Sequence, residues 1–291
     1  NENYNNDYNI DTINNIDTIN NIDTINNIDT IDNIDDIDDI NDIDDIDDNY
    51  IIKEIKSREG RNVVAGDDEP FYRYKRQRFL EMLKAVNFEG KSVLEIGNGP
   101  GGNLKELSQL NPARLVGADI SAEMIELARS NNNDFVELVK IDGTSLPFED
   151  NTFDIVFTAT VLQHNTDDKM MLTILDEICR VSKDKIFLFE KIDSVIKGDD
   201  LCYARPVQYY ADLVSPHGFE LASTEYINIR SSYFVSGAIR KGLNTSKRQE
   251  GEPLNRISTL LQKITLPVTK ILDKIFSSKK DVARLEFIKK R

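Results

Sequence analysis

The chain of 291 residues is long enough for one or two domains, and 40% of its residues are hydrophobic. Its formal net charge of −15 is unevenly spread, because residues 1–50 hold 16 of the 51 acidic residues and no Lys or Arg. The other 35 acids nearly balance the 36 bases, so the overall charge excludes no class of partner for the rest of the chain.

The first 50 residues form a low-complexity repeat in which an isoleucine recurs at every third position from Ile10 to Ile46. A three-residue step drifts by about 60° around a helix, and a strand needs a period of two. A left-handed β-helix has a matching period, but the repeat lacks glycines and small residues for its corners. We therefore expect a disordered acidic interaction tail at 1–50, followed by a linker at 51–70.

From residue 71 onward, the pattern predicts alternating helices and strands. A helix is expected over 69–86, and apolar strands over 92–97, 113–120, 134–142, 153–161 and 185–192. Helices are expected at 103–110, 121–131 (with Ser121 as its N-cap), 169–182 and 207–218, and further strands at 219–230 and 282–290. This alternation predicts an α/β fold, a Rossmann-like doubly wound sheet of seven strands with helices on both faces and the last strand antiparallel.

The two cysteines, Cys179 and Cys202, have no metal-ligand spacing and cannot make a disulfide framework. We expect no metal site and a reducing, cytoplasmic compartment. No stretch reaches 18 apolar residues, and the N-terminus has no signal-peptide pattern. No basic, aromatic-interleaved stripe predicts nucleic-acid binding.

A glycine loop follows the first strand in "VLEIGNGPGGN", residues 93–103. Gly97, Gly99 and Gly102 fit the spacing of a dinucleotide site, whereas Gly97, Gly99 and Gly101 fit a different cofactor loop. Asp119, 22 positions after Gly97, ends the second strand, where a carboxylate can accept bonds from both ribose hydroxyls. Both alternatives require that acid, so it does not distinguish between them.

Three other features favour the second alternative. Glu95 lies in the first strand, where an anion would suit a cofactor with a cationic amino-acid end better than a pyrophosphate. Asp142 ends the third strand and can accept a bond from an adenine amino group. The last two strands suggest an antiparallel pair at the sheet edge.

The motifs "VLEIGNGPGGN", "VGADIS" and "DGTSLPFEDNTFDIVFT" together resemble those of the class I S-adenosylmethionine-dependent methyltransferases, of the small-molecule (methyltransferase type 11-like) group. The resemblance covers about residues 71–239 and the last strand. It implies that Glu95 orients the methionine amino group and that Gly97, Gly99 and Gly101 lie under the methionine and ribose. It further implies the following contacts: Asp119 with ribose, Ile120 with adenine, Asp142 and the Gly143 backbone with the adenine amino group, and Thr158 with the methionine part.

Asp119 and Asp142 have a second interpretation, as N-cap or turn residues, because each precedes Ser or Gly. His164 follows the fourth strand on the substrate side and is the candidate general base, with a packing or capping role as the alternative. Glu190, Lys191 and Arg205 are expected to line the acceptor side. No Asp/Asn-Pro-Pro-Tyr/Phe run follows the fourth strand, which disfavours methylation of a nucleic-acid base.

An amphipathic helical insert is expected at about 245–280 in the methyltransferase domain 71–291. Its apolar stripe comprises Leu254, Ile257, Leu261, Ile264, Val268, Ile271 and Ile275, with lysines beside it and Pro267 expected to kink or divide it. The stripe could pack on the domain as a lid. Alternatively, residues 254–276 could make a peripheral contact with an anionic membrane or a lipid-linked acceptor.

These observations predict methyl transfer from S-adenosylmethionine to a small-molecule acceptor, foremost O-methylation of a sugar, glycolipid or similar metabolite. An NAD-binding oxidoreductase is the alternative enzyme, which Glu95 and Asp142 disfavour. A catalytically silent binding module, recruited through the acidic repeat, is the alternative outside enzymes.

Overall fold

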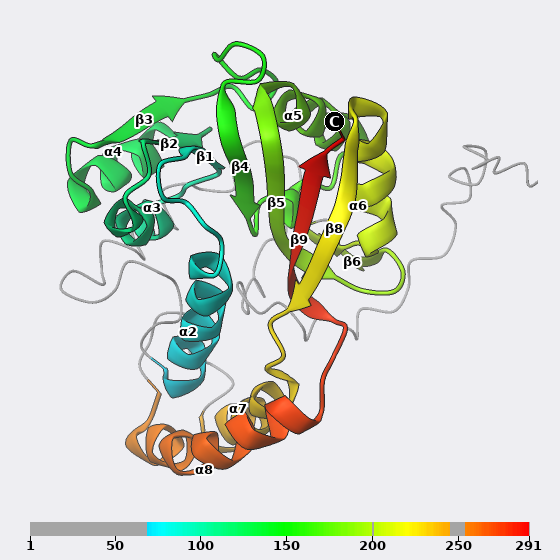
Figure 1. Ribbon diagram of the computed structural model, residues 1–291. Coiled ribbons are helices and arrows are strands. Elements are labelled where there is room, and N and C mark those ends of the chain that lie inside the picture. The colour runs from blue at the N-terminus through cyan, green and yellow to red at the C-terminus, as the bar shows by residue number, and fades with distance from the viewer. Residues whose placement is uncertain (1–68, 200, 245–253, 291) are drawn as a thin grey trace, which may run out of the picture. The chain divides into compact units, whose positions relative to one another are not determined.

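The computed structural model describes residues 69–199, 201–244 and 254–290 (Figure 1). The acidic repeat at 1–50 lies outside the described residues. So do the expected linker, apart from its last two residues, and residues 245–253 of the expected insert. The predictions made for those segments therefore stay predictions.

Seven strands form one sheet in the order β3-β2-β1-β4-β5-β9-β8 (Figure 1). Their bounds are β1 Ser92–Ile96, β2 Arg114–Asp119, β3 Val136–Lys140, β4 Phe153–Ala159, β5 Ser182–Ile192, β8 Phe219–Tyr226 and β9 Asp281–Lys289. The pairs among β1 to β5 are parallel, whereas β9 runs antiparallel to both β5 and β8. The predicted doubly wound sheet with an antiparallel last strand is confirmed.

Helices cover both faces of the sheet, which explains why the central strands are apolar throughout. On one face, Leu94 and Val156 share an apolar core with α5 (Asp168–Val181) and α6 (Val207–Val214). On the other face, neighbouring strand residues pack with α2 (Pro70–Lys84) and α3 (Gly102–Leu107). Helix α4 (Ala122–Asn131) begins at the predicted cap, where the Ser121 hydroxyl accepts a bond from the Met124 N–H at 3.3 Å.

Two parts of the fold differ from the sequence prediction. The strand expected at 219–230 ends at Tyr226, and helix α7 (Arg230–Leu243) follows it. A short hairpin of β6 (Lys197–Asp199) and β7 (Cys202–Ala204) lies between β5 and α6 and was not predicted. Three short 3₁₀ turns, η3 (Ser108–Leu110), η4 (Leu162–His164) and η5 (Ser215–His217), complete the order of elements.

Helix α8 (Arg256–Ile275) packs beside α7 and touches α2 (Figure 1). Pro267 was expected to kink or divide this segment. It does not divide it, because one helix continues through the proline, and the kink stays a prediction. The buried side chains of α8 are polar: Ser258, Gln262, Thr269 and Asp273. Asp273 accepts bonds from the backbone N–H groups of Ser231 (2.6 Å) and Ser232 (3.2 Å), and so satisfies the first turn of α7.

We expect Asp273→Ala to lower the free energy of unfolding by about 1–3 kcal/mol, because it leaves buried donors of α7 without an acceptor. Urea denaturation measures this change. Lys274→Ala, at the exposed neighbouring position of the same helix, is the control and should have little effect. Equal stability of the two variants would contradict the capping role.

Candidate functional site

The loop after β1 has a left-handed backbone, with φ of 70° at Gly97, 48° at Gly99 and 80° at Gly101. A Cβ atom at Gly97 would lie 2.3 Å from the Val161 side chain, whereas one at Gly99 would meet nothing within 4 Å. The backbone at Gly99 therefore faces open space, and a ligand can lie directly against it. The loop lies at the carboxyl ends of the parallel strands, where doubly wound sheets bind ligands.

Glu95 is the penultimate residue of β1, beside this loop, and is buried. Its Oε1 accepts a bond from Asn103 Nδ2 at 2.7 Å, while Oε2 has no hydrogen-bond partner among the described residues. Burial raises the pKa of Glu95 to about 8, against the lowering effects of the Asn103 bond and the Arg76 charge. A buried carboxyl oxygen without a partner requires an explanation, and a cationic ligand group would supply one.

Two residues that the sequence analysis missed hold Glu95 in place. Arg76 of α2 donates to Asn103 Oδ1 at 2.7 Å, and Asn103 in turn donates to Glu95. The chain of contacts ties the first helix of the domain to the glycine loop. Asn103 is the second residue of α3 and directly follows the last glycine, which is the one sequence signal that could have identified it.

Asp119 lies at the end of β2, and its carboxylate accepts two backbone bonds. Oδ2 accepts from the Gly99 N–H at 2.7 Å, and Oδ1 accepts from the Ser121 N–H at 2.9 Å. Asp119 thereby fixes the glycine loop, and a carboxylate has lone pairs for further donors such as hydroxyls.

Ile120, the next residue, is 64% exposed, although it is a large apolar side chain beside buried strands. A Cβ atom on Gly143 would lie 3.4 Å from Ile120 Cγ2, so the ends of β2 and β3 meet here. Exposed apolar surface at this place offers a flat ring, such as adenine, a surface to pack on.

The Asp142 side chain closes a turn with the backbone of the residues that follow it. Its Oδ1 accepts from the N–H groups of Thr144 and Ser145, both at 2.8 Å, and these bonds lower the pKa of Asp142 to about 2. The turn interpretation therefore describes its contacts in this structure. Its Oδ2 has a single contact, at 3.2 Å from Ser145 Oγ, and the adenine role stays a prediction.

Glu190 and Thr158, two of the predicted site residues, contact each other in the interior. Thr158 Oγ1 donates to Glu190 Oε1 at 2.7 Å, and both residues are fully buried. Glu190 also accepts from the N–H groups of Val161 (3.2 Å) and Gln163 (3.0 Å). Burial raises the pKa of Glu190. Because all of its surface is covered, the expectation that Glu190 faces an acceptor is corrected: it holds the chain after β4.

Arg205 is also fully buried, which corrects the expectation that its charge lines the acceptor side. Its guanidinium donates to the carbonyls of Leu162 (2.8 Å) and Asn165 (2.6 Å), on either side of His164. Arg205 and Glu190 therefore fix the same turn, η4, from its carbonyl and N–H sides. Neither presents a charge to solvent.

His164 is the last residue of η4. The residue is exposed to solvent, yet both of its ring nitrogens contact protein atoms. Nδ1 lies 3.1 Å from the Leu201 carbonyl, and Nε2 lies 3.1 Å from the Gln163 side-chain nitrogen. A carbonyl only accepts, so Nδ1 carries the proton and Nε2 carries the lone pair. Packing of the ring against the hairpin lowers the pKa of His164, and the nearby Lys191 charge acts in the same direction.

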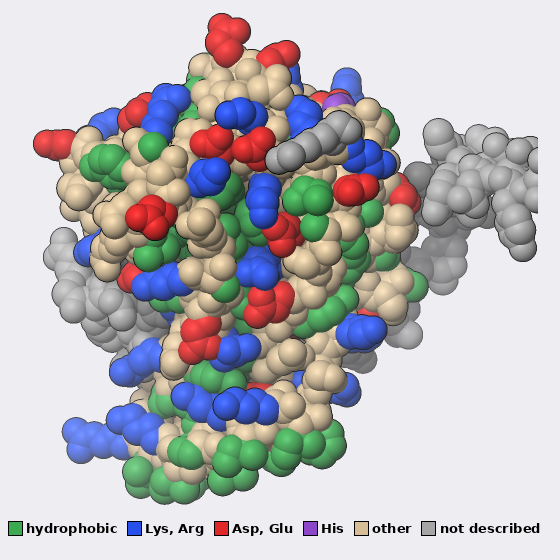
Figure 2. Space-filling model, viewed as in Figure 1, with side chains coloured by type: hydrophobic (Ala, Val, Ile, Leu, Met, Phe, Trp, Pro, Cys, Tyr) green, Lys and Arg blue, Asp and Glu red, His purple; other side chains and the backbone are tan. Residues whose placement is uncertain are grey.

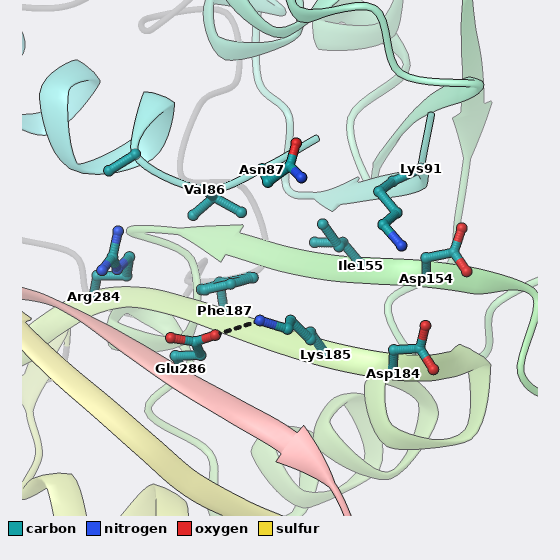
Figure 3. A pocket seen from close by; sticks show the side chains of 11 residues that line it. Val86, Asn87, Lys91, Asp154, Ile155, Asp184, Lys185, Phe187, Arg284 and Glu286 are labelled. Atoms are coloured by element: carbon teal, nitrogen blue, oxygen red, sulfur yellow. Dashed lines mark hydrogen bonds and ion pairs between the residues drawn. The ribbon is translucent and has the colours of Figure 1, made fainter. Parts of the chain in front are cut away.

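A hollow of about 430 Å³ lies away from this edge (Figure 3). It is lined by the amino-terminal parts of β4 and β5 and by Val86 and Asn87, which follow α2. Lys185 and Glu286 face each other in it as an ion pair at 2.7 Å. Since parallel sheets bind ligands at the opposite ends of their strands, we do not assign the cofactor to this hollow.

The sheet order, the antiparallel last strand and the buried carboxyl beside a glycine loop define the class I methyltransferase fold. Residues 93–185 match the family model described as a methyltransferase domain. The chain therefore contains a class I S-adenosylmethionine-dependent methyltransferase domain, as the resemblance predicted, and S-adenosylmethionine is the cofactor of this class.

Curated relatives agree with this class. The chain is 32% identical over 108 residues to a malonyl-[acyl-carrier protein] O-methyltransferase of Legionella pneumophila, covering 36% of this chain and 38% of that protein. It is 34% identical over 96 residues to a fatty-acid O-methyltransferase of Mycolicibacterium smegmatis, covering 32% and 35%. These matches span well under half the length of either relative.

Solved structures agree in fold. A S-adenosylmethionine-dependent methyltransferase from Mesorhizobium loti has a TM-score of 0.51 at 13% identity, covering 73% of this chain and 98% of that one. The [4+2]-cyclase SpnF has a TM-score of 0.50 at 18% identity, covering 74% and 81%. A fold shared with a cyclase does not by itself determine the reaction.

We expect Glu95→Gln to have opposite effects on stability and on cofactor affinity. Without cofactor, the folded pKa of about 8 exceeds the ordinary 4.5, so the stability that Glu95 contributes falls as pH rises from 4.5 to 8. The amide removes that loss, about 2–4 kcal/mol at pH 7. Urea denaturation at pH 5 and pH 8 measures it, with a larger gain at pH 8.

The same variant should bind S-adenosylmethionine more weakly in calorimetry, because the amide has no charge for the ammonium group. Asn87→Ala, at an exposed loop position beside the other hollow, is the control and should change neither quantity. A variant with unchanged affinity would remove Glu95 from the cofactor site.

Proposed function

We propose that the chain transfers a methyl group from S-adenosylmethionine to a hydroxyl of a sugar-bearing or other lipid-linked small molecule. The observation that supports it best is the buried carboxyl of Glu95, with one unpartnered oxygen, beside the open backbone of Gly99. Two relatives are described as methyltransferases of a fatty acid and of a malonyl-acyl carrier, which favours a lipid-linked acceptor over a free sugar.

The residues present fit the proposed cofactor. Glu95 would hold the amino group, the Gly97–Gly101 loop would lie under the methionine and ribose, Asp119 would accept from the ribose hydroxyls, and Ile120 would pack on the adenine. When bound, the cofactor supplies the methyl group as an electrophile. The protein then has to align the acceptor oxygen and remove its proton.

We assign proton removal to His164. The Nδ1–H bond to the Leu201 carbonyl leaves the lone pair on Nε2, and the lowered pKa keeps the ring neutral at pH 7. The Gln163 amide that contacts Nε2 has to give way to the acceptor hydroxyl. Nε2 would then accept the proton of that hydroxyl, while the cofactor held by Glu95, Asp119 and the glycine loop would supply the methyl group and keep the electron pair of the broken sulfur–carbon bond. Glu190, Arg205 and Thr158 act as positioning residues, because they hold the turn that carries the histidine.

Label transfer tests the proposal directly. The protein is incubated with methyl-labelled S-adenosylmethionine and with separate lipid and water-soluble extracts, and labelled products are identified by mass spectrometry. A labelled methyl ether in the lipid extract is expected. Label in neither extract, with intact cofactor binding, would contradict transfer to a metabolite. A thermal shift with NAD but not with S-adenosylmethionine would favour the oxidoreductase alternative.

His164→Ala should lower kcat by about 10²–10⁴-fold while leaving cofactor affinity nearly unchanged, since general-base help has this magnitude. The wild-type rate should be level at pH 7 and fall only below about pH 6.5, because the pKa of His164 is lowered. His217→Ala, which removes a histidine paired with Asp176 at 2.9 Å, is the matched control. Retention of rate and pH profile in His164→Ala would refute the assignment.

We further propose that residues 254–276 make the protein peripheral to a membrane on the cytoplasmic side. The side chains that α8 buries are polar, whereas its apolar stripe faces outward. Five of the seven stripe residues, Ile257, Ile264, Val268, Ile271 and Ile275, are each 60–64% exposed, and the neighbouring Leu260 is 57% exposed. Figure 2 draws this stripe as a hydrophobic band along one edge of the molecule, with Lys and Arg side chains beside it.

Because α8 buries polar side chains and exposes apolar ones, its outer side favours an apolar environment such as a lipid surface. A lid packed by its stripe would bury Ile264 and Ile271, which are both exposed. Among the described residues, no helix is long and apolar enough to span a bilayer, so α8 would lie along the surface. Lys263 and Lys274, beside the stripe, match an anionic headgroup layer.

We expect Ile264→Asp with Ile271→Asp to weaken binding to vesicles of phosphatidylcholine and phosphatidylserine by roughly tenfold or more per residue, since each apolar side chain leaves the lipid. Vesicle co-sedimentation measures this, and binding should fall as salt rises. The control is Met170→Asp with Leu172→Asp, two exposed apolar residues of α5. Equal binding of both variants would contradict the α8 contact.

A further inference from the structure

A second hollow, of about 370 Å³, lies between the end of β5, the start of α7 and the segment that joins α8 to β9. Its lining includes Arg230, Ser277, Ser278, Lys279 and Lys280. None of these residues belongs to the cofactor or proton-transfer site. The hollow is distinct from the one in Figure 3, which lies at the amino ends of the strands.

The charges in this hollow are not balanced. Lys280 Nζ pairs with Asp193 at 2.9 Å, and that pair neutralises the acid of the lining. Within the described ranges, Arg230 and Lys279 make no ion pair, and the guanidinium of Arg230 lies over the Phe234 ring at 5.7 Å. Two cations without an acid partner, in one concave place, favour an anionic ligand.

Hydroxyl groups add directional donors to these charges. Ser278 Oγ accepts from the Lys280 N–H at 3.3 Å, so its own hydrogen can be donated to a ligand. Ser277 is exposed in the same lining and supplies a second hydroxyl. A guanidinium, an ammonium and two hydroxyls are the donors that bind phosphate oxygens in proteins.

Exposed apolar side chains adjoin the lining residues along the chain. Ile275 and Phe276, the residues immediately before Ser277, are 64% and 60% exposed. They continue the outward stripe of α8, and Phe234 beside Arg230 is exposed as well. A ligand that combines a phosphate with an acyl chain would satisfy both surfaces at once.

We infer that this hollow binds the phosphate headgroup of an amphiphilic lipid, with the acyl chain along the apolar end of α8. The inference rests on the proposed membrane contact, and it names the headgroup chemistry that the contact selects. The hollow opens at the carboxyl end of β5, the edge of the sheet that also carries His164. A lipid held there would approach the domain from its substrate side.

The test compares the wild-type full chain with a double variant that carries both Arg230→Gln and Lys279→Gln. Calorimetry with short-chain phosphatidic acid, kept below its micellar concentration, measures headgroup binding without a bilayer. We expect wild-type binding, and a loss of roughly tenfold or more in the variant, because two charge-assisted contacts are removed. Lys169→Gln with Lys290→Gln, two exposed lysines elsewhere, is the control for net charge.

Two further probes identify the source of the phosphate and separate this inference from the proposed reaction. Inorganic phosphate should bind more weakly than the short-chain lipid, and equal affinity would overturn the acyl-chain part of the inference. Cofactor affinity and urea stability should be unchanged in the double variant. Undiminished phosphatidic acid binding in that variant, or no binding to wild type, would overturn the site, whatever the result of the methyl-transfer assay.

Discussion

The buried carboxyl of Glu95 is the constraint on which the arrangement of the site depends. It lies one residue before the end of β1, between β2 and β4 in the sheet, and burial raises its pKa to about 8. A carboxyl in this place destabilises the cofactor-free fold when it ionises, so its presence favours a ligand that brings a positive charge. Asn103 and Arg76 limit that cost without removing it, because Oε2 has no hydrogen-bond partner in the part of the chain that the structure describes.

The turn that carries His164 depends on a second buried group. Glu190 accepts the N–H bonds of the chain after β4, and Arg205 donates to the carbonyls of the same segment. Two buried ionisable side chains therefore fix a short 3₁₀ turn at the carboxyl edge of the sheet. The outward apolar face of α8 reverses the usual pattern in the same domain, with Asp273 and Gln262 buried and Ile264 exposed. In the proposed function, the fixed turn carries the proposed base, and the apolar face of α8 contacts the lipid surface that would supply the acceptor.

The sequence predicts the sheet well because buried parallel strands are apolar runs, and because a carboxylate at a strand end, such as Asp119, has a position fixed by the fold. The sequence predicts poorly where its pattern does not show which side of an element is buried. The stripe of α8 has a helical period, but a period does not tell which side is covered. Glu190 and Arg205 looked exposed because charged residues usually are, and only their distant partners make their burial possible. The β6–β7 hairpin was missed because β6 is exposed throughout and shows no alternation.

The most direct test of the central claim is calorimetry of S-adenosylmethionine binding at pH 7 in two buffers of different ionisation enthalpy. If Glu95 is protonated in the cofactor-free protein and ionises to pair with the cofactor ammonium, binding should release close to one proton, and the apparent enthalpy should differ between the buffers accordingly. Glu95→Gln should abolish that difference. Binding without proton release in the wild type would contradict the account, because the buried carboxyl would then not be the partner of the cofactor.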